Sequence, residues 1–129
     1  MLFRSVTVIA LGALVPLAER AARELAAEGI EIEIVDPRTL VPLDTELIAA
    51  SVAKTHRVVV AHEAVEFCGF GAEIAARIAQ DSFWDLDAPV VRVGAPHHPI
   101  PYQKDLEQLT LPGAREVAAA VRALLAGQN

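Results

Sequence analysis

The sequence predicts one α/β domain, a mostly parallel sheet covered by helices on both faces. Apolar residues make up 53% of the 129 residues and aromatic residues only 5%. A chain so rich in Ala, Val, Leu and Ile is typical of strands buried on both faces under Ala-rich helices. Strand-like and helix-like patterns also alternate with short connections, which is the pattern of parallel strands joined by right-handed crossovers. The length fits one domain, and no linker-like stretch interrupts the pattern.

The first strand and the first helix are predicted from the N-terminal third. Residues 5–11 are almost uniformly apolar and are expected to form a buried strand. Pro16 fits only the first turn of a helix, so the next helix is expected to begin near Leu14 or Val15. Gly29 is expected to end that helix.

The middle of the chain repeats this alternation. Isoleucines alternate with glutamates in residues 30–36, which predicts a strand with one wetter face near a sheet edge. Asp44 is a favourable N-cap for a second helix that runs to about Lys54. Residues 57–61 contain the apolar run Val58, Val59, Val60 and Ala61, which predicts a central strand.

The remaining elements complete a pattern with four clear strands. A third helix is expected to follow the turn at residues 69–71, residues 90–93 form the last strand, and Gly113 opens the final helix. Residues 1–5 are interpreted as a leader or a cloning remnant, residues 6–126 as the domain, and residues 127–129 as a frayed tail.

Charge and cysteine content exclude several classes. The net charge of −6 and the lack of any basic run argue against a nucleic-acid-binding protein. Cys68 is the only cysteine, which excludes an intrachain disulfide and fits a cytoplasmic protein; it is interpreted as a small buried side chain. Gly12 and Pro16 interrupt the apolar stretch 5–18, so neither a signal peptide nor a membrane span is expected.

His62 and Glu63 are the first candidate functional residues. They come at the end of the expected central strand, where open α/β sheets usually place ligand groups. A histidine there could perform acid–base chemistry near neutral pH. A hydrogen-bonded histidine at a domain or subunit contact explains the same position, so both interpretations stay open.

Two loops supply further candidates. Gly69 and Gly71, on either side of Phe70, free the backbone before a helix N-terminus, which favours anions. The turn lacks the third glycine of a dinucleotide-binding motif and the Lys-Ser/Thr of a P-loop. Tight turning and close packing are the favoured explanation of the glycines, and a nucleotide-binding doubly wound domain stays an alternative. His97 and His98 are adjacent and lack metal-ligand spacing, so no metal site is expected. Their loop is expected to be rigid, exposed and suited to contacting another chain, because prolines recur at Pro96, Pro99 and Pro101.

Several ordered stretches resemble one known family. They are Ile9–Ala13, Val35–Asp44, His62–Ala64, Gly69–Ile74, Leu86–Val90 and Ala95–Tyr102. Together they resemble the transketolase-like C-terminal domain of the β subunit in thiamine-diphosphate-dependent decarboxylase components of pyruvate, branched-chain and acetoin-type 2-oxo acid dehydrogenases. The resemblance runs from about Val6 to Leu125. It departs at Cys68, where the family often has glycine.

The resemblance implies a fold and a division of labour. The fold would be a three-layer α/β/α sandwich with a mostly parallel mixed sheet of about five strands, one of them antiparallel. In the family an upstream β-subunit domain contacts the aminopyrimidine of thiamine diphosphate, and the α subunit holds its diphosphate and magnesium. This domain would then bind neither cofactor alone and would support oxidative decarboxylation through contacts with the α subunit, the upstream domain and the acyltransferase core.

The resemblance also assigns roles to residues. It places His62, beside Glu63, nearest the entrance of the assembled active site. The expected contact residues are Gly69, Phe70, Gly71, Pro96, His97, His98, Pro99, Ile100, Pro101 and Tyr102. Self-association into a homo-oligomer is expected because Phe70 and the proline-rich loop would be exposed. A stand-alone association or regulatory module of the same fold stays an alternative.

Overall fold

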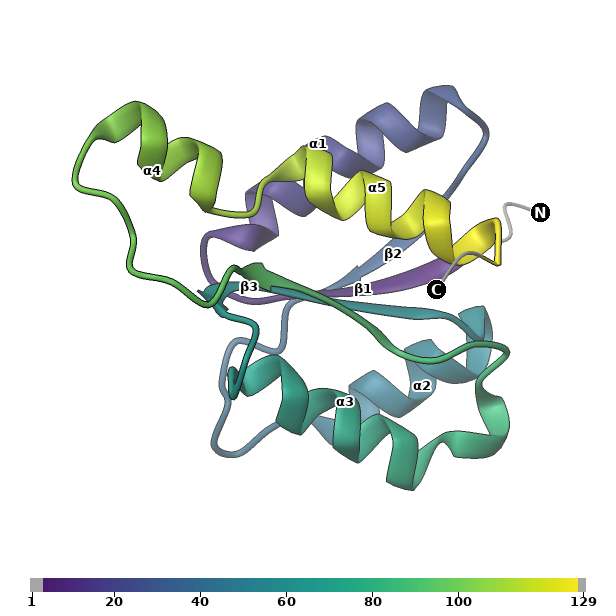
Figure 1. Ribbon diagram of the computed structural model, residues 1–129. Coiled ribbons are helices and arrows are strands. Elements are labelled where there is room, and N and C mark those ends of the chain that lie inside the picture. Colours follow the sequence, from purple (N-terminus) through teal and green to yellow (C-terminus); the bar gives the residue numbers. More distant parts are fainter. Residues whose placement is uncertain (1–3, 128–129) are drawn as a thin grey trace.

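A computed structural model describes residues 4–127, arranged in three layers around one sheet (Figure 1). The strands are β1 (Val6–Ala10), β2 (Ile32–Val35), β3 (Val58–Val65) and β4 (Val91–Ala95). The helices are α1 (Leu14–Ala27), α2 (Thr45–Thr55), α3 (Phe70–Asp81), the short 3-10 helix η1 (Phe83–Asp85), α4 (Lys104–Thr110) and α5 (Ala114–Leu125). Helices α1 and α5 cover one face of the sheet, and α2 and α3 cover the other (Figure 1). What the sequence suggested for residues 1–3 and 128–129 lies outside the described residues.

The sheet has the order β2-β1-β3-β4, and every neighbouring pair is parallel. The α/β sandwich is therefore confirmed, and so are the central position of β3 and the edge position of β2. Over residues 4–127 the sheet has four strands, whereas the resemblance implied about five with one antiparallel. Between β4 and α5 the chain forms α4 rather than another strand.

Two apolar cores hold the layers together. One lies between the sheet and α1 and α5, and includes the fully buried Leu14, Leu25 and Val121. The other lies between the sheet and α2 and α3, and includes Ile9 and Ile74. Each fully buried Leu, Ile or Val contributes roughly 1.5–3 kcal/mol relative to an exposed one. The two-sided core explains why the strands are apolar on both faces.

Local sequence signals set the ends of the helices as expected. Helix α1 begins at Leu14, which places Pro16 in its first turn. Gly29, with φ +79°, follows the end of α1 in a left-handed conformation that glycine adopts without strain. The Asp44 carboxylate accepts a hydrogen bond of 2.9 Å from the Leu47 backbone N–H and caps α2.

The expectation that the glutamate side chains form a wetter face of β2 is wrong for Glu33. Glu33 is only 8% exposed, whereas Ile32 and Ile34 on the opposite face are only partly buried. Helix α2 covers the Glu33 side, and the Glu33 carboxylate is paired with Arg4 at 2.8 Å and Lys54 at 3.2 Å. Burial does alternate along β2, but the ion pairs of Glu33 allow the glutamate face to be the buried one.

Residues 4 and 5, which the sequence alone assigned to a leader or remnant, lie against β2. Arg4 reaches Glu33, and the Ser5 backbone N–H donates a hydrogen bond of 2.7 Å to the Glu31 carbonyl. In residues 4–127 no helix combines the length and the apolar character that a membrane crossing requires.

Candidate functional site

The candidate residues gather where the carboxyl ends of the parallel strands meet. His62 and Glu63 both lie in β3, and because successive side chains alternate along a strand they point to opposite faces. His62 is only 4% exposed and lies under the start of α3. Glu63 is exposed and lines a hollow beside α1 and α5. The two side chains therefore do not form one acid–base pair.

His62 is held in one tautomer by its surroundings. Its Nδ1 lies 3.0 Å from the Ala64 carbonyl oxygen, which can only accept, so Nδ1 carries the proton and donates it. The other ring nitrogen, Nε2, is buried and has no hydrogen-bond partner among the described residues. The imidazole therefore fills the space between the end of β3 and the first turn of α3.

Gly69 and Gly71 are required by this close packing rather than by backbone conformation. Gly69 has an ordinary extended conformation with φ −74°. A Cβ on Gly69 would collide first with the Val65 carbonyl oxygen and would also lie 2.8 Å from His62 Cε1, whereas one on Gly71 would lie 2.5 Å from His62 Nε2. The structure thus brings three candidate residues together, but as a packed junction between β3 and α3.

Two expectations for the neighbouring residues are wrong. Cys68 is exposed instead of buried and takes the left-handed conformation of the turn, with φ +55°. Phe70 was expected to be exposed, but it packs against the core beneath α3. Phe67 is the exposed aromatic residue of this loop, at 64% exposure. The reversed exposures follow from the turn direction, which no local signal in the sequence fixes.

The proline-rich loop is exposed as predicted. Its exposed residues are Pro96, His97, His98, Pro99, Ile100 and Tyr102, and Pro101 is partly buried. His97 stacks on Phe67 with the ring centroids 4.7 Å apart, which joins this loop to the loop before α3. Across residues 4–127 no three His, Cys, Asp or Glu side chains come together in a way that could hold a metal ion.

Helix α4 is a feature that the sequence reasoning missed. We call residues 96–112 the α4 arm, because α4 stands away from the three layers (Figure 1) and has no buried residue. Leu106 and Leu109 are exposed and lie at i and i+3 on one face of α4, and the exposed Tyr102 precedes the helix. That spacing is visible in the sequence and could have identified the arm.

An open hollow of about 800 Å³ lies between the α4 arm and the starts of α1 and α5. Leu17 and Leu109 supply apolar lining, and Arg20, Glu63 and Asp105 supply charge. Such a mixed, open surface suits a protein contact better than a small ligand, because ligand sites are usually enclosed and mostly apolar.

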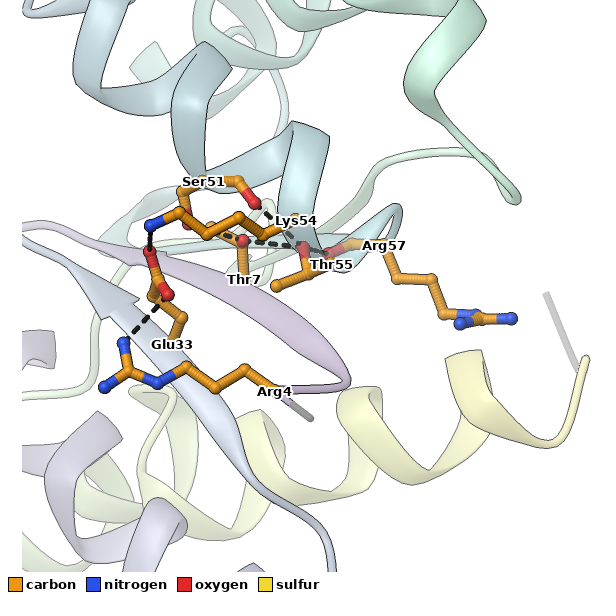
Figure 2. Close-up of polar contacts among 7 residues, drawn as sticks. All are labelled: Arg4, Thr7, Glu33, Ser51, Lys54, Thr55 and Arg57. Atoms are coloured by element: carbon orange, nitrogen blue, oxygen red, sulfur yellow. Dashed lines mark hydrogen bonds and ion pairs between the residues drawn. The ribbon is translucent and has the colours of Figure 1, made fainter. Parts of the chain in front are cut away.

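A polar cluster lies on the other side of the sheet, between β1 and α2 (Figure 2). The Thr7 hydroxyl lies 2.7 Å from the Ser51 hydroxyl and 2.8 Å from the Thr55 hydroxyl. The Thr55 hydroxyl also donates within this cluster, toward the carbonyls of Ser51 and Arg57. Because its members satisfy one another, the cluster attaches α2 to the sheet and offers no free group to a ligand.

Glu33 adds a charged group beside this cluster (Figure 2). Burial raises the pKa of its carboxyl, but hydrogen bonds from Arg4, Ser51 and Lys54 outweigh burial and hold the pKa below its ordinary value. Glu33 is therefore ionised at neutral pH, and its charge is matched by two cations.

The two candidate polar side chains, His62 and Glu63, do not converge on one site. Magnesium and a diphosphate need several converging oxygen and N–H groups. Here His62 is covered by α3, and Glu63 is exposed on the opposite face of the sheet. What the arrangement offers instead is exposed apolar surface on two joined loops and one unsupported helix.

Comparison with known proteins agrees with this organisation. A model of the family described as "Transketolase, C-terminal domain" matches residues 4–117. The chain is 43% identical to an acetoin:2,6-dichlorophenolindophenol oxidoreductase subunit beta of Cupriavidus necator over 124 residues, which is 96% of this chain and 37% of that protein. It is 40% identical to a pyruvate dehydrogenase E1 component subunit beta of Rhizobium meliloti, covering 94% of this chain and 26% of that protein.

A solved structure shows the same fold. The chain superimposes with a TM-score of 0.83 and 33% identity on "Split gene transketolase, inactive beta4 tetramer", over 98% of this chain and 41% of that one. The chain thus spans about a third of the length of the β subunits it matches. By the extent of the family match and the identity to these β subunits, the chain belongs to the transketolase C-terminal domain family.

Proposed function

We propose that this chain serves as the C-terminal assembly domain of a 2-oxo acid dehydrogenase β subunit of the pyruvate or acetoin type. One observation carries the proposal: over nearly all of its length the chain is similar to β subunits of such enzymes. The exposed apolar residues of the α4 arm support it, because they need another protein surface to cover them.

The proposed contribution is association rather than chemistry. Thiamine diphosphate and magnesium would be held by the α subunit and by the upstream β-subunit domain of the assembled enzyme. This division is supported by the separation of His62 from Glu63 on opposite faces of the sheet. The cofactor supplies the carbanion chemistry, and protein contacts orient the cofactor for that chemistry.

The proposed contact surface combines two segments. The stacked Phe67 and His97 rings join the loop before α3 to the α4 arm. Along the arm, Ile100, Tyr102 and Leu109 are exposed. Contacts with the α subunit, with the acyltransferase core and with a second copy of this chain are the proposed roles of this surface in a cytoplasmic enzyme.

Co-purification tests the proposal directly. The tagged chain is isolated from cells that produce it naturally, and the proteins bound to it are identified. We expect an α-type decarboxylase subunit in a fixed ratio with the chain, because the exposed arm requires a partner. Recovery of the chain without any such subunit would favour the stand-alone module instead.

Ligand binding separates association from cofactor binding. The purified chain is melted with and without thiamine diphosphate and Mg²⁺. A ligand at 100 times its Kd adds about 2.7 kcal/mol to the free energy of unfolding and raises the melting temperature. We expect no increase for the chain alone and an increase for its complex with the α-type subunit. An increase for the chain alone would contradict the proposed division of labour.

A further inference from the structure

Strand β4 leaves one side of its backbone unpaired among residues 4–127. It is the outermost strand, and β3 is its only neighbour in the sheet. The Ala95 carbonyl accepts a hydrogen bond of 2.9 Å from the Glu66 backbone N–H, so the backbone groups of Ala95 point toward β3. Because backbone groups alternate sides along a strand, those of Arg92 and Gly94 point outward. An open edge of this kind can accept another strand.

Exposed aromatic residues flank both ends of this open edge. A groove beside the start of β4 is lined by Phe83, Trp84 and Val90, and Trp84 is 93% exposed. A second hollow beside the end of β4 is lined by Arg92, Pro96 and the stacked Phe67 and His97 rings. Monomeric proteins rarely leave such surface uncovered on both sides of an open strand.

We propose that β4 pairs antiparallel with β4 of a second copy, across a two-fold axis at Val93, to form one continuous eight-stranded sheet. The inference rests on the proposed function, for which it specifies the surface of self-association. A two-fold axis makes this an isologous contact, in which each copy offers the same surface. Strand addition at an open edge supplies the main-chain hydrogen bonds.

Charge and backbone chemistry select the register. Within β4 only Arg92 and Gly94 have backbone N–H and C=O groups that point outward. Three antiparallel registers can pair these groups with those of a second copy. Placing Arg92 opposite Arg92 of the second copy opposes like charges, which destabilises a strand pair. Placing Gly94 opposite Gly94 of the second copy sets Arg92 opposite Pro96, which has no N–H to donate. Placing Arg92 opposite Gly94 of the second copy avoids both faults within β4, because Pro96 then falls opposite Val90, which lies outside the strand.

The selected register also pairs opposite charges. A Cβ on Gly94 would lie 3.1 Å from Glu66 Cα, so Glu66 lies beside Gly94. Arg92 of each copy would therefore face Glu66 of the other copy. Within one copy the Arg92 guanidinium donates a hydrogen bond of 2.7 Å to the Glu66 carbonyl oxygen and lies 3.7 Å from the Glu66 carboxylate, with 31% and 45% of the two side chains exposed. Arg92 can therefore keep its bond to the carbonyl while its other N–H groups reach the Glu66 carboxylate of the second copy.

The same register joins the aromatic surfaces. Val90 falls opposite Pro96 of the second copy, so the groove that holds Trp84 meets the stacked Phe67 and His97 rings. Because of the two-fold symmetry this contact occurs twice, so both aromatic surfaces of each copy are covered by the other copy. Trp84 is the only tryptophan of the chain, so its emission reports on this contact alone.

Charge reversal and mixing test the pairing. Sedimentation velocity of the full chain over a range of concentrations gives the dimer dissociation constant. We expect Arg92→Glu alone and Glu66→Arg alone to raise that constant by at least about tenfold, because each opposes like charges across the axis. An equimolar mixture of the two variants is expected to form the heterodimer with near-native affinity. Such recovery could not come from an ion pair within one chain, because each variant carries like charges at residues 66 and 92.

The controls make the result decisive. Arg23→Glu makes the same charge change on exposed α1 surface and is expected to leave the dissociation constant within about twofold of native. Circular dichroism checks that every variant is folded. Trp84 emission is expected to shift to shorter wavelength as the native dimer forms, and in the mixture but not in either variant alone.

Three outcomes would overturn the inference: a native chain that stays monomeric, single variants that dimerise like the native chain, or a mixture that fails to recover. If an α-type subunit still co-purifies with the chain in those cases, the proposed function stands and only the β4 pairing falls.

Discussion

His62 illustrates how one side chain can set the sequence of its neighbours. Its ring occupies the space in which a side chain at residue 71 would lie, and the ring and the Val65 carbonyl oxygen together fill the space for a side chain at residue 69, so both positions require glycine. The glycine-rich turn, which in a sequence resembles an anion-binding loop, is explained by this close packing.

Gly71→Ala is expected to lower the free energy of unfolding by about 1–3 kcal/mol, because the added methyl overpacks a buried site. Gly113→Ala is the control: its Cβ would lie 3.4 Å from the end of the flexible Glu116 side chain, and we expect a change below about 0.5 kcal/mol. The loss of unfolding free energy caused by Gly71→Ala should be smaller when His62 is also replaced by alanine. Urea denaturation gives these values, and an undiminished loss in that background would exclude the imidazole as the cause.

Glu33 connects protonation to stability. Its pKa is lower in the folded chain than in the unfolded chain, where it lies near 4.3. The ionised carboxylate therefore stabilises the fold above the unfolded value, and this contribution is lost as the pH falls through the lower native value.

Glu33→Gln is expected to cost about 1 kcal/mol at pH 7, because its two cationic partners are themselves well exposed and lose little when unpaired. The variant should also show a weaker loss of stability below about pH 4.3 than the native chain. Denaturation curves at a series of pH values measure both effects. Glu31→Gln, at a neighbouring residue with no ion pair among the described residues, should match the native pH profile.

At the level of elements, α4 differs from every other α-helix of the described chain. The other α-helices bury at least three residues each, whereas α4 buries none. An isolated helix of seven residues is marginal in water, so α4 should open readily in the chain alone. We expect fast hydrogen exchange in α4 and slow exchange in α1 in the purified chain.

Leu106→Gln with Leu109→Gln tests the arm as a contact. The free energy of unfolding should change by less than about 0.5 kcal/mol, because neither side chain is buried within the chain. Affinity for the co-purified α-type subunit should fall at least about tenfold if the apolar stripe is at the contact. Lys104→Gln, in the same helix, should have little effect. Equal affinities for the native chain and the leucine variant would remove α4 from the proposed surface.

The elements that could be predicted depended on local signals. Pro16 and Asp44 act within one turn of their own helices, and the apolar run in β3 fixes its central position without reference to other segments. These features follow from the backbone chemistry of a few adjacent residues.

The features that could not be predicted depend on distant parts of the chain. Glu33 is buried because Arg4 and Lys54 approach it from other elements. The exposures of Phe67 and Cys68 depend on how the loop turns over the end of β3. A sequence pattern identifies a strand with alternating side chains, but only tertiary contacts decide which face of that strand is buried.

At the scale of the whole molecule, the chain combines a two-sided core with exposed apolar residues outside the sheet. The core contains side chains from both faces of the sheet and is closed within residues 4–127. The exposed apolar residues lie largely in connecting loops and in α4. A domain built this way can fold by itself and still need partners for its function.

A domain exchange tests the central claim, that this domain completes a β subunit by contact. The C-terminal third of the Cupriavidus necator β subunit, which is 43% identical to this chain, is replaced by residues 4–127. The chimera is produced with its own α subunit and assayed for acetoin-dependent reduction of dichlorophenolindophenol. We expect an assembled complex with measurable activity, and neither assembly nor activity for the β subunit truncated before this domain. A folded chimera that fails to assemble with the α subunit would contradict the claim.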